Sequence, residues 1–212
     1  MKVVVCVEPW GLSEASRAAL MMAARLQPAL VTALAATDGS AAEALAEAQR
    51  LGAVRTAQVV EVALESLDVG ALGKTLSDAL LHLQADLVLC GARSDGEGRG
   101  VVPAAIAHHW RAPYLPHVEE LSVSGGEALV LVRSGGKKRR LAVKLPALLT
   151  VGATLGVGPS PPAPAPPSAV EILRLHDLDD RTLNRASDLG ALEKSKRKPH
   201  AATSASDLLR RW

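Results

Sequence analysis

The segment CGARSDGEGRGVVPAA, from Cys90 to Ala105, has the residue types best suited to chemistry in this sequence. It leads an apolar run, DLVLCG, into a loop rich in glycine and charge, and then becomes apolar again at helical spacing. Where such a loop precedes a helix, backbone N–H groups can point at an anion, often a phosphate. The alternative is a surface turn whose charges face water. These residues alone leave both interpretations open.

Other motifs predict binding rather than covalent chemistry. The glycines of GEGRG, at 96, 98 and 100, lack the spacing of a dinucleotide fingerprint, which would also follow the first strand. SGGEA, from Ser124, resembles the pyrophosphate loop of ATP pyrophosphatases, but no Asp-Ser follows and a hairpin turn is favoured. His108 and His109 are adjacent on a predicted helix, so they point to different faces. The sequence has no zinc-ligand spacing and no nucleophile elbow.

Composition narrows the class of protein further. Aromatic residues make up 2% of the 212 residues, which argues against recognition of single-stranded nucleic acid by base stacking. The net charge of +2 predicts no partner, and KKRR, at 137–140, is interpreted as a solvated strand edge. The two cysteines, Cys6 and Cys90, lie in apolar runs and are predicted to be small buried hydrophobes. No apolar run has the length of a membrane span and the sequence starts directly with a strand, so we expect a cytoplasmic protein.

The elements that must position the glycine loop alternate between strand and helix. Ser13 is a predicted N-cap and Gly52 a predicted C-cap. We expect strands at 2–9, 29–37, 57–63 and 86–91, and helices at 13–27, 41–52, 70–85 and 101–110. This alternation predicts an α/β fold, a doubly wound, mostly parallel sheet with helices on both faces. Ligands bind such sheets beyond the carboxyl ends of the strands, where the loop after the fourth strand would lie.

The remainder of the chain has a different character. Runs separated by Ser-Gly-Gly turns, from His117 to Gly152, predict an extension of antiparallel strands. Six of the thirteen prolines follow in GPSPPAPAPPSA, and the charged residues beyond them have too little apolar surface to fold alone. We therefore divide the chain into a nucleotide-binding-type α/β domain (1–156), a proline-rich arm (157–170) and an extended C-terminal tail (171–212).

Four segments, in order along the chain, resemble the beta subunit of electron transfer flavoprotein. KVVVCVEP resembles the opening strand of that family and ALAEAQRLGAVR a helix that ends in Gly-Ala-Asp-Arg. DLVLCGARSDGEGRGVVP is similar to the family's AMP loop, and LAVKLPALLTVG to the strand that precedes its partner-recognition loop. The resemblance covers nearly the whole chain and implies an adenine-nucleotide fold, of the adenine-nucleotide α-hydrolase type, that no longer catalyses a reaction.

The resemblance also implies cofactors and partners. In the family an alpha subunit carries most of the FAD site, the beta subunit commonly holds a structural AMP, and the heterodimer takes electrons from flavin dehydrogenases. The phosphate of an AMP would face the helix N-terminus near 98–101. The residues implied for the AMP site are Cys6, Ala36, Gly91, Asp95, Gly98, Arg99, Gly100 and Val101.

Several positions depart from the family pattern. Glu8 stands where the family has Lys, Val54 replaces the Asp of Gly-Ala-Asp, and the segment before the first helix is shorter. In the AMP loop one residue is missing, and Gly98-Arg99-Gly100 replaces Thr-Gly-Gln. Arg99 either binds the phosphate, which suits a guanidinium, or is merely exposed. The recognition loop is proline-rich around Pro164, so we expect a flavin dehydrogenase other than the usual acyl-CoA type.

These points lead to one prediction and one alternative. We expect an electron carrier subunit, not a catalyst by itself, in a heterodimer that passes electrons from a flavin dehydrogenase to a downstream acceptor. The tail from Asp177 to Trp212 would wrap the alpha-type subunit. The alternative is a free-standing adenine-nucleotide sensor that resembles universal stress proteins. Nucleotide hydrolysis is disfavoured because the loop has no evident base, metal ligand or phosphate lysine.

Overall fold

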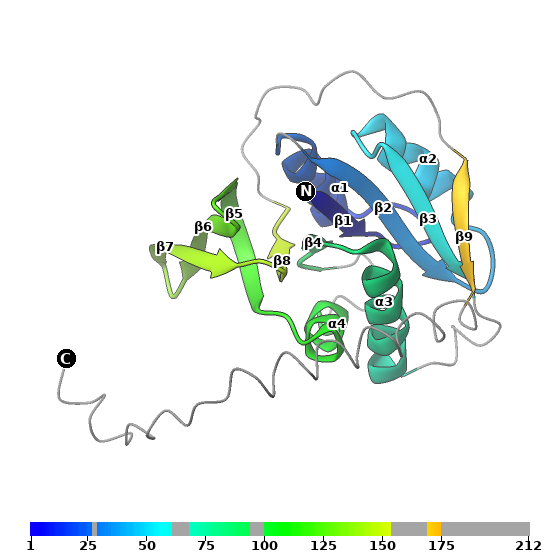
Figure 1. Ribbon diagram of the computed structural model, residues 1–212. Coiled ribbons are helices and arrows are strands. Elements are labelled where there is room, and N and C mark those ends of the chain that lie inside the picture. The colour runs from blue at the N-terminus through cyan, green and yellow to red at the C-terminus, as the bar shows by residue number, and fades with distance from the viewer. Residues whose placement is uncertain (27–28, 61–67, 94–99, 154–168, 175–212) are drawn as a thin grey trace.

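The computed structural model describes residues 1–26, 29–60, 68–93, 100–153 and 169–174. Within these residues the chain forms a mostly parallel sheet of nine strands and four helices (Figure 1). The helices are α1 (Glu14–Ala24), α2 (Ala42–Arg50), α3 (Val69–Leu83) and α4 (Val102–Trp110). The strands are β1 (Lys2–Cys6), β2 (Leu30–Thr37), β3 (Arg55–Val60), β4 (Leu87–Gly91), β5 (Tyr114–Ser124), β6 (Glu127–Ser134), β7 (Lys137–Lys144), β8 (Ala147–Val151) and β9 (Val170–Arg174).

The strand order creates a switch point beside β1. The order is β7-β6-β5-β8-β4-β1-β2-β3-β9, and every pairing from β5–β8 to β3–β9 is parallel. The chain proceeds from β1 to β2 and β3 on one side, and then returns to place β4 on the other side of β1. The connections after β1 and β4 therefore leave in opposite directions. Such a point is where ligands bind in open α/β sheets.

Two apolar layers hold the helices against the sheet. Along β1, Val3 and Val5 pack in the cluster that contains the buried faces of α1 and α2. Val4, between them, belongs to the cluster that contains the buried residues of α3 and α4. This alternation follows from the two-residue period of a strand. The predicted doubly wound α/β fold is therefore confirmed, with one helix pair on each face.

The predicted alternation of strands and helices is confirmed, with ends that differ by a few residues. The Ser13 side chain caps α1 by accepting from the backbone N–H of Ser16. Gly52 has a φ of +109°, and it follows Leu51, the C-cap of α2, rather than being the cap itself. The predicted third strand continues into residues 61–63, which lie outside the described residues.

The expectation of antiparallel pairing through Gly152 is wrong for the last strand. The two Ser-Gly-Gly turns do join β5, β6 and β7 into antiparallel hairpins. The chain then leaves β7, and β8 enters the sheet between β4 and β5, parallel to both. All five residues of β8 are buried. A short, continuous apolar run of this kind is typical of a buried parallel strand rather than of a half-exposed antiparallel one.

The strand β9 spans the predicted boundary between residues 170 and 171. Val170–Arg174 pair in parallel with β3 at the far edge of the sheet (Figure 1). Arg55 and Glu171 form an ion pair of 2.6 Å across these two strands. Residues 171–174, which the prediction assigned to the tail, therefore belong to a strand of the α/β sheet. Their backbone pairs with β3. The proline-rich residues 154–168 and the residues 175–212 lie outside the described part of the chain.

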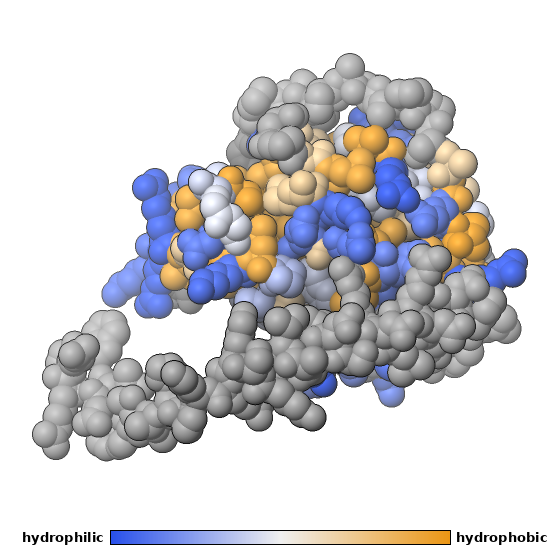
Figure 2. Space-filling model, in the orientation of Figure 1, coloured by the Kyte–Doolittle hydropathy of each residue, from blue (hydrophilic) through white to orange (hydrophobic). Residues whose placement is uncertain are grey.

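The basic segment 137–140 forms an exposed edge, as predicted. It begins β7, the outermost strand of the antiparallel hairpins β5–β7 (114–144), which we call the hairpin lobe. All four side chains of the basic segment are exposed. Hydrophilic side chains gather at this end of the molecule (Figure 2). Lys138 and Arg133 both contact the carboxylate of Glu119 on β5. Charged side chains on an edge strand discourage pairing with the edge of another sheet.

Candidate ligand-binding site

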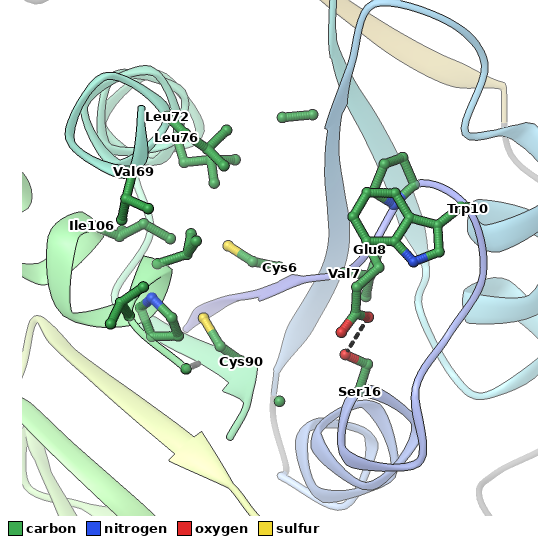
Figure 3. A pocket seen from close by; sticks show the side chains of 17 residues that line it. Cys6, Val7, Glu8, Trp10, Ser16, Val69, Leu72, Leu76, Cys90 and Ile106 are labelled. Atoms are coloured by element: carbon green, nitrogen blue, oxygen red, sulfur yellow. Dashed lines mark hydrogen bonds between the residues drawn. The ribbon is translucent and has the colours of Figure 1, made fainter. Parts of the chain in front are cut away.

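A cavity of about 430 Å³ lies at the carboxyl ends of β1 and β4 (Figure 3). Its walls come from the loop after β1, the end of β4, the start of α4 and one face of α3. The lining residues are Cys6–Trp10, Ser16, Ala36, Val69, Leu72, Leu76, Cys90, Gly91, Gly100, Val101, Val102, Pro103 and Ile106. This is the switch point of the sheet, so the topology and the cavity indicate the same place.

Five of the eight residues implied for the AMP site line this cavity. They are Cys6, Ala36, Gly91, Gly100 and Val101. They come from β1, β2, β4 and the loop before α4, which are far apart in sequence. The other three residues, Asp95, Gly98 and Arg99, lie in the segment 94–99, outside the described residues.

Two glycines allow the walls of the cavity to approach each other. Gly100 has a φ of +59°, and a Cβ at this position would lie 2.7 Å from the carbonyl oxygen of Ala92. The end of the loop is therefore folded back against the start of the loop. A Cβ at Gly91 would lie 3.0 Å from both the backbone nitrogen and the Oγ of Ser16. A side chain at Gly91 would require β4 and α1 to separate by a few tenths of an ångström.

The start of α4 forms one end of the cavity. Val101, its N-cap, makes no side-chain capping bond, and Pro103 lies in the first turn. Backbone N–H groups in the first turn of a helix have no partner within the helix, and they favour an anion. Gly100, the last glycine of the loop, comes two residues before this helix, and residues 94–99 of the loop lie outside the described part of the chain.

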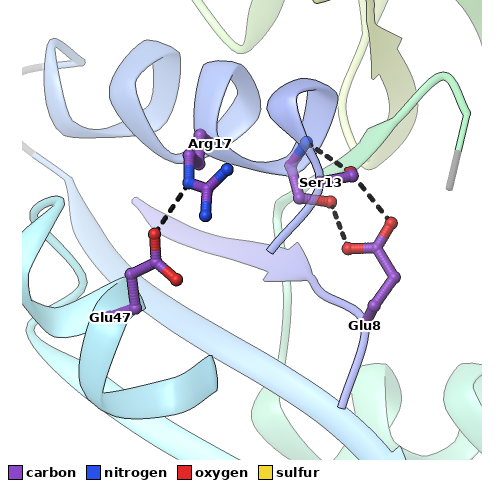
Figure 4. Close-up of polar contacts among 5 residues, drawn as sticks. Glu8, Ser13, Arg17 and Glu47 are labelled. Carbon is purple, nitrogen blue, oxygen red and sulfur yellow. Dashed lines mark hydrogen bonds and ion pairs between the residues drawn. The ribbon is translucent and has the colours of Figure 1, made fainter. Parts of the chain in front are cut away.

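Glu8 is a cavity residue whose role the sequence did not reveal. Its carboxylate accepts hydrogen bonds from the Oγ of Ser13, at 3.0 Å, and from the Oγ of Ser16, at 2.7 Å (Figure 4). The carboxylate therefore lies at the N-terminus of α1, where the helix dipole stabilises negative charge. An ion pair of 2.7 Å between Arg17 and Glu47 joins the same helix to α2 (Figure 4). The signal in the sequence is the position of Ser13 and Ser16, five and eight residues after an acidic residue.

Trp10 is a second residue of the cavity that the sequence left unassigned. Its side chain lines the cavity and is nevertheless 75% exposed, so it lies at the opening. Val69 and Val101 also line the cavity and are substantially exposed. An exposed indole beside apolar side chains offers a flat surface to an aromatic ligand. The low aromatic content of the chain had predicted few anchors of this kind.

The two cysteines lie next to each other on the floor of the cavity. Cys6 on β1 and Cys90 on β4 are register partners, and both are free thiols. Cys90 is buried as predicted, whereas Cys6 is only partly buried, because the cavity opens beside it. A hydrogen bond with the Cys6 thiol and burial raise the pKa of Cys90 well above its ordinary value of 9.0. The charge of Glu8 raises this pKa further.

No metal centre appears in the part of the chain that the structure describes. His108 and His109 have exposed side chains, and their rings meet edge to face with centroids 5.2 Å apart. No group of three or more His, Cys, Asp or Glu residues among those described could hold an ion.

Among the described helices, none is both long enough and apolar enough to cross a membrane.

Comparisons with known proteins identify the family of this chain. A family model described as the electron transfer flavoprotein domain matches residues 2–177. An electron transfer flavoprotein subunit beta of Mycobacterium leprae is 37% identical over 99 residues, which is 46% of this chain and 37% of that protein. The subunit beta of Mycobacterium tuberculosis is 32% identical over 123 residues, covering 57% of this chain and 46% of that protein. The matches therefore span less than half the length of these relatives.

Proposed function

Because the chain belongs to the electron transfer flavoprotein domain family, as a relative of the beta subunits, we propose that it is the beta-type subunit of a heterodimeric electron carrier. In this proposal the chain takes part in electron transfer between a flavin dehydrogenase and a downstream acceptor and does not catalyse a reaction by itself. The observation that carries the proposal is the cavity at the β1–β4 switch point, in a chain that the family model matches from residue 2 to residue 177.

The proposal assigns a structural AMP to this cavity. The apolar wall from α3 and the exposed indole of Trp10 suit an adenine ring, because each offers apolar contact area. The first turn of α4 suits the phosphate, because its backbone N–H groups favour an anion. The carboxylate of Glu8 would repel a phosphate, so the phosphate is assigned to the α4 end, with Arg99 as its proposed side-chain partner.

The proposal also assigns partners and a location. FAD would be held mainly by an alpha-type subunit, which the residues beyond Asp177 would wrap. The dehydrogenase would be one other than the usual acyl-CoA type, because the proline-rich stretch around Pro164 replaces the family's recognition loop. A cytoplasmic location is part of the same proposal.

Purification from the native cells tests the heterodimer. The full chain would be tagged and isolated gently, and the absorption spectrum and the co-purifying chains would be recorded. A flavin spectrum together with one larger chain in equal amount supports the proposal. A colourless protein that purifies alone or as a self-dimer overturns it and favours a free-standing nucleotide sensor.

The nucleotide assignment is tested separately. The purified protein would be denatured, and the released nucleotide would be identified and quantified by chromatography. The proposal expects AMP at one per chain, a loss of AMP in Arg99→Ala, and unchanged AMP in the matched variant Arg93→Ala, whose side chain is exposed in the same loop. If no nucleotide is released, the cavity does not hold AMP. If Arg99→Ala retains AMP, Arg99 does not bind the phosphate.

A further inference from the structure

The two cysteines of this chain are brought together by the sheet. Their positions in the sequence are 84 residues apart, but the register of β1 and β4 makes Cys6 and Cys90 direct partners. Side chains of register partners in parallel strands point to the same face. Their sulfur atoms lie on the same side of the sheet, toward α3 and α4 (Figure 3). The two thiols therefore lie side by side on neighbouring strands.

The separation of the strands is compatible with a covalent bond. Neighbouring strands lie about 4.8 Å apart, and disulfides join residues whose Cα atoms are about 4.4 to 6.8 Å apart. Cys6 is the last residue of β1, and only Gly91 follows Cys90 in β4. A small inward shift at the ends of two strands disturbs fewer ladder hydrogen bonds than the same shift in the middle of the sheet.

The cavity provides access to this pair. Both thiols line it, and its opening is bordered by the exposed side chains of Trp10 and Val101. Cys6 is the more accessible of the two, since Cys90 is only 4% exposed. A small oxidant can therefore reach Cys6 first, while Cys90 is held beside it as the second thiol.

We propose that Cys6 and Cys90 form a redox-active dithiol that a hydroperoxide converts into an intramolecular disulfide on the floor of the cavity. In the first step the sulfur of Cys6 attacks the hydroperoxide, the O–O bond breaks, and Cys6 becomes a sulfenic acid while water or an alcohol leaves. In the second step the thiol of Cys90 attacks the Cys6 sulfur, the S–O bond breaks, and water leaves as the S–S bond forms. Two thiols are oxidised and one peroxide is reduced, with two protons transferred to oxygen.

The burial of Cys90 leaves Cys6 as the thiol that reacts first. A raised pKa keeps Cys90 as a thiol, and thiolates are the reactive form of cysteine. A ligand in the cavity would cover Cys6, so this inference applies to the cavity when it is empty.

Mass spectrometry of the reduced, full-length protein after treatment with hydrogen peroxide tests the proposal. The expected product is a monomer that is lighter by two hydrogen atoms, has lost both titratable thiols, and yields a peptide that links Cys6 to Cys90. Dithiothreitol should restore both thiols. The proposal is overturned if both thiols survive, if Cys6 proceeds to sulfinic acid while Cys90 stays reduced, or if the disulfides join separate chains.

Two variants identify the order of the steps. In Cys90→Ser the sulfenic acid of Cys6 has no second thiol to react with, so a dimedone adduct should accumulate at Cys6. In Cys6→Ser the buried Cys90 should lose its thiol at least ten-fold more slowly than Cys6 does in Cys90→Ser. Equal rates for the two single thiols would overturn the assigned order. If either variant fails to fold by circular dichroism, the linked peptide from the natural protein still decides the proposal.

Discussion

The carboxylate of Glu8 and the hydroxyl of Ser16 are joined by a hydrogen bond of 2.7 Å that fastens the loop after β1 to the first turn of α1. Ser16 is 1% exposed, and its backbone nitrogen and Oγ also lie against Gly91 at the end of β4. One serine therefore contacts both the loop after β1 and the end of β4. The shape of the cavity depends on this polar contact as well as on its apolar walls.

Removal of the Glu8 carboxylate should destabilise the fold. Glu8→Ala leaves the buried hydroxyls of Ser13 and Ser16 without their acceptor, and we expect a loss of about 1–3 kcal/mol in the free energy of unfolding. Urea denaturation measures this loss. The matched control is Glu14→Ala, which removes an exposed carboxylate in the first turn of α1, and for which about 0.3–1 kcal/mol is expected. Equal losses in the two variants would show that Glu8 acts only through the helix dipole.

A methyl group at Gly73 should push α3 and α4 apart. A Cβ at this position would lie 2.6 Å from the Cβ of Ala105 and 2.9 Å from its carbonyl carbon. We expect Gly73→Ala to cost about 1–3 kcal/mol by overpacking, although alanine favours a helix by about 1 kcal/mol over glycine. Gly70→Ala in the same helix is the control, because its nearest neighbour is only the Asp68 carboxylate oxygen, at 3.1 Å. Thermal unfolding that ranks Gly70→Ala as the less stable variant would contradict the packing argument.

The raised pKa of Cys90 should make the folded state sensitive to alkali. An unfolded Cys90 ionises near its ordinary pKa of 9.0, whereas the folded thiol stays protonated to higher pH. The contribution of this thiol to stability is therefore complete below the ordinary pKa and is lost as the pH rises toward the raised one. The loss should approach about 1.4 kcal/mol per pH unit in that window. Urea denaturation across this pH range should show a shallower decline in Cys90→Ser, and identical slopes would contradict the expectation.

The hairpin lobe offers a titration that can be measured at one residue. A hydrogen bond from Arg133 lowers the pKa of Glu119 below its ordinary value of 4.5, with a smaller contribution from Lys138. This contribution to stability is present above pH 4.5 and is lost as the pH falls through the lowered pKa. In an NMR titration, Arg133→Gln should move the pKa of Glu119 back toward 4.5. Arg139→Gln, an exposed substitution on β7, should leave it in place, and the reverse ranking would contradict the assignment.

Removal of the Glu171 charge should make the edge strand β9 open more often, with little change in the free energy of unfolding of the whole chain. Glu171 pairs with Arg55 at 2.6 Å, and His82 on α3 approaches the same carboxylate at 3.8 Å. Partly exposed pairs contribute about 0–1 kcal/mol, so Glu171→Gln should change the global free energy of unfolding very little. Hydrogen exchange of the β9 amides should nevertheless accelerate, because an edge strand opens locally. Unchanged exchange in β9 would mean that the backbone pairing with β3 alone holds this strand.

The local pattern of the sequence determined the elements. The alternation of apolar strands with amphipathic helices predicted the doubly wound fold, because strand and helix periods are properties of a few neighbouring residues. The Ser13 cap and the Ser-Gly-Gly turns were predictable for the same reason. The glycine loop before α4 was also recognisable, since Gly100 needs a positive φ that glycine adopts readily.

The tertiary structure alone decided which distant residues meet. The insertion of β8 between β4 and β5, and of β9 beside β3, depends on strand order, which no local period encodes. The contact of Glu8 with Ser16 requires the path of the loop after β1, and the pairing of Cys6 with Cys90 requires the register of two strands. A shift of one residue in that register would turn one thiol to the opposite face of the sheet. The cavity that unites these residues therefore exists only because long-range pairing fixed which strand ends lie side by side.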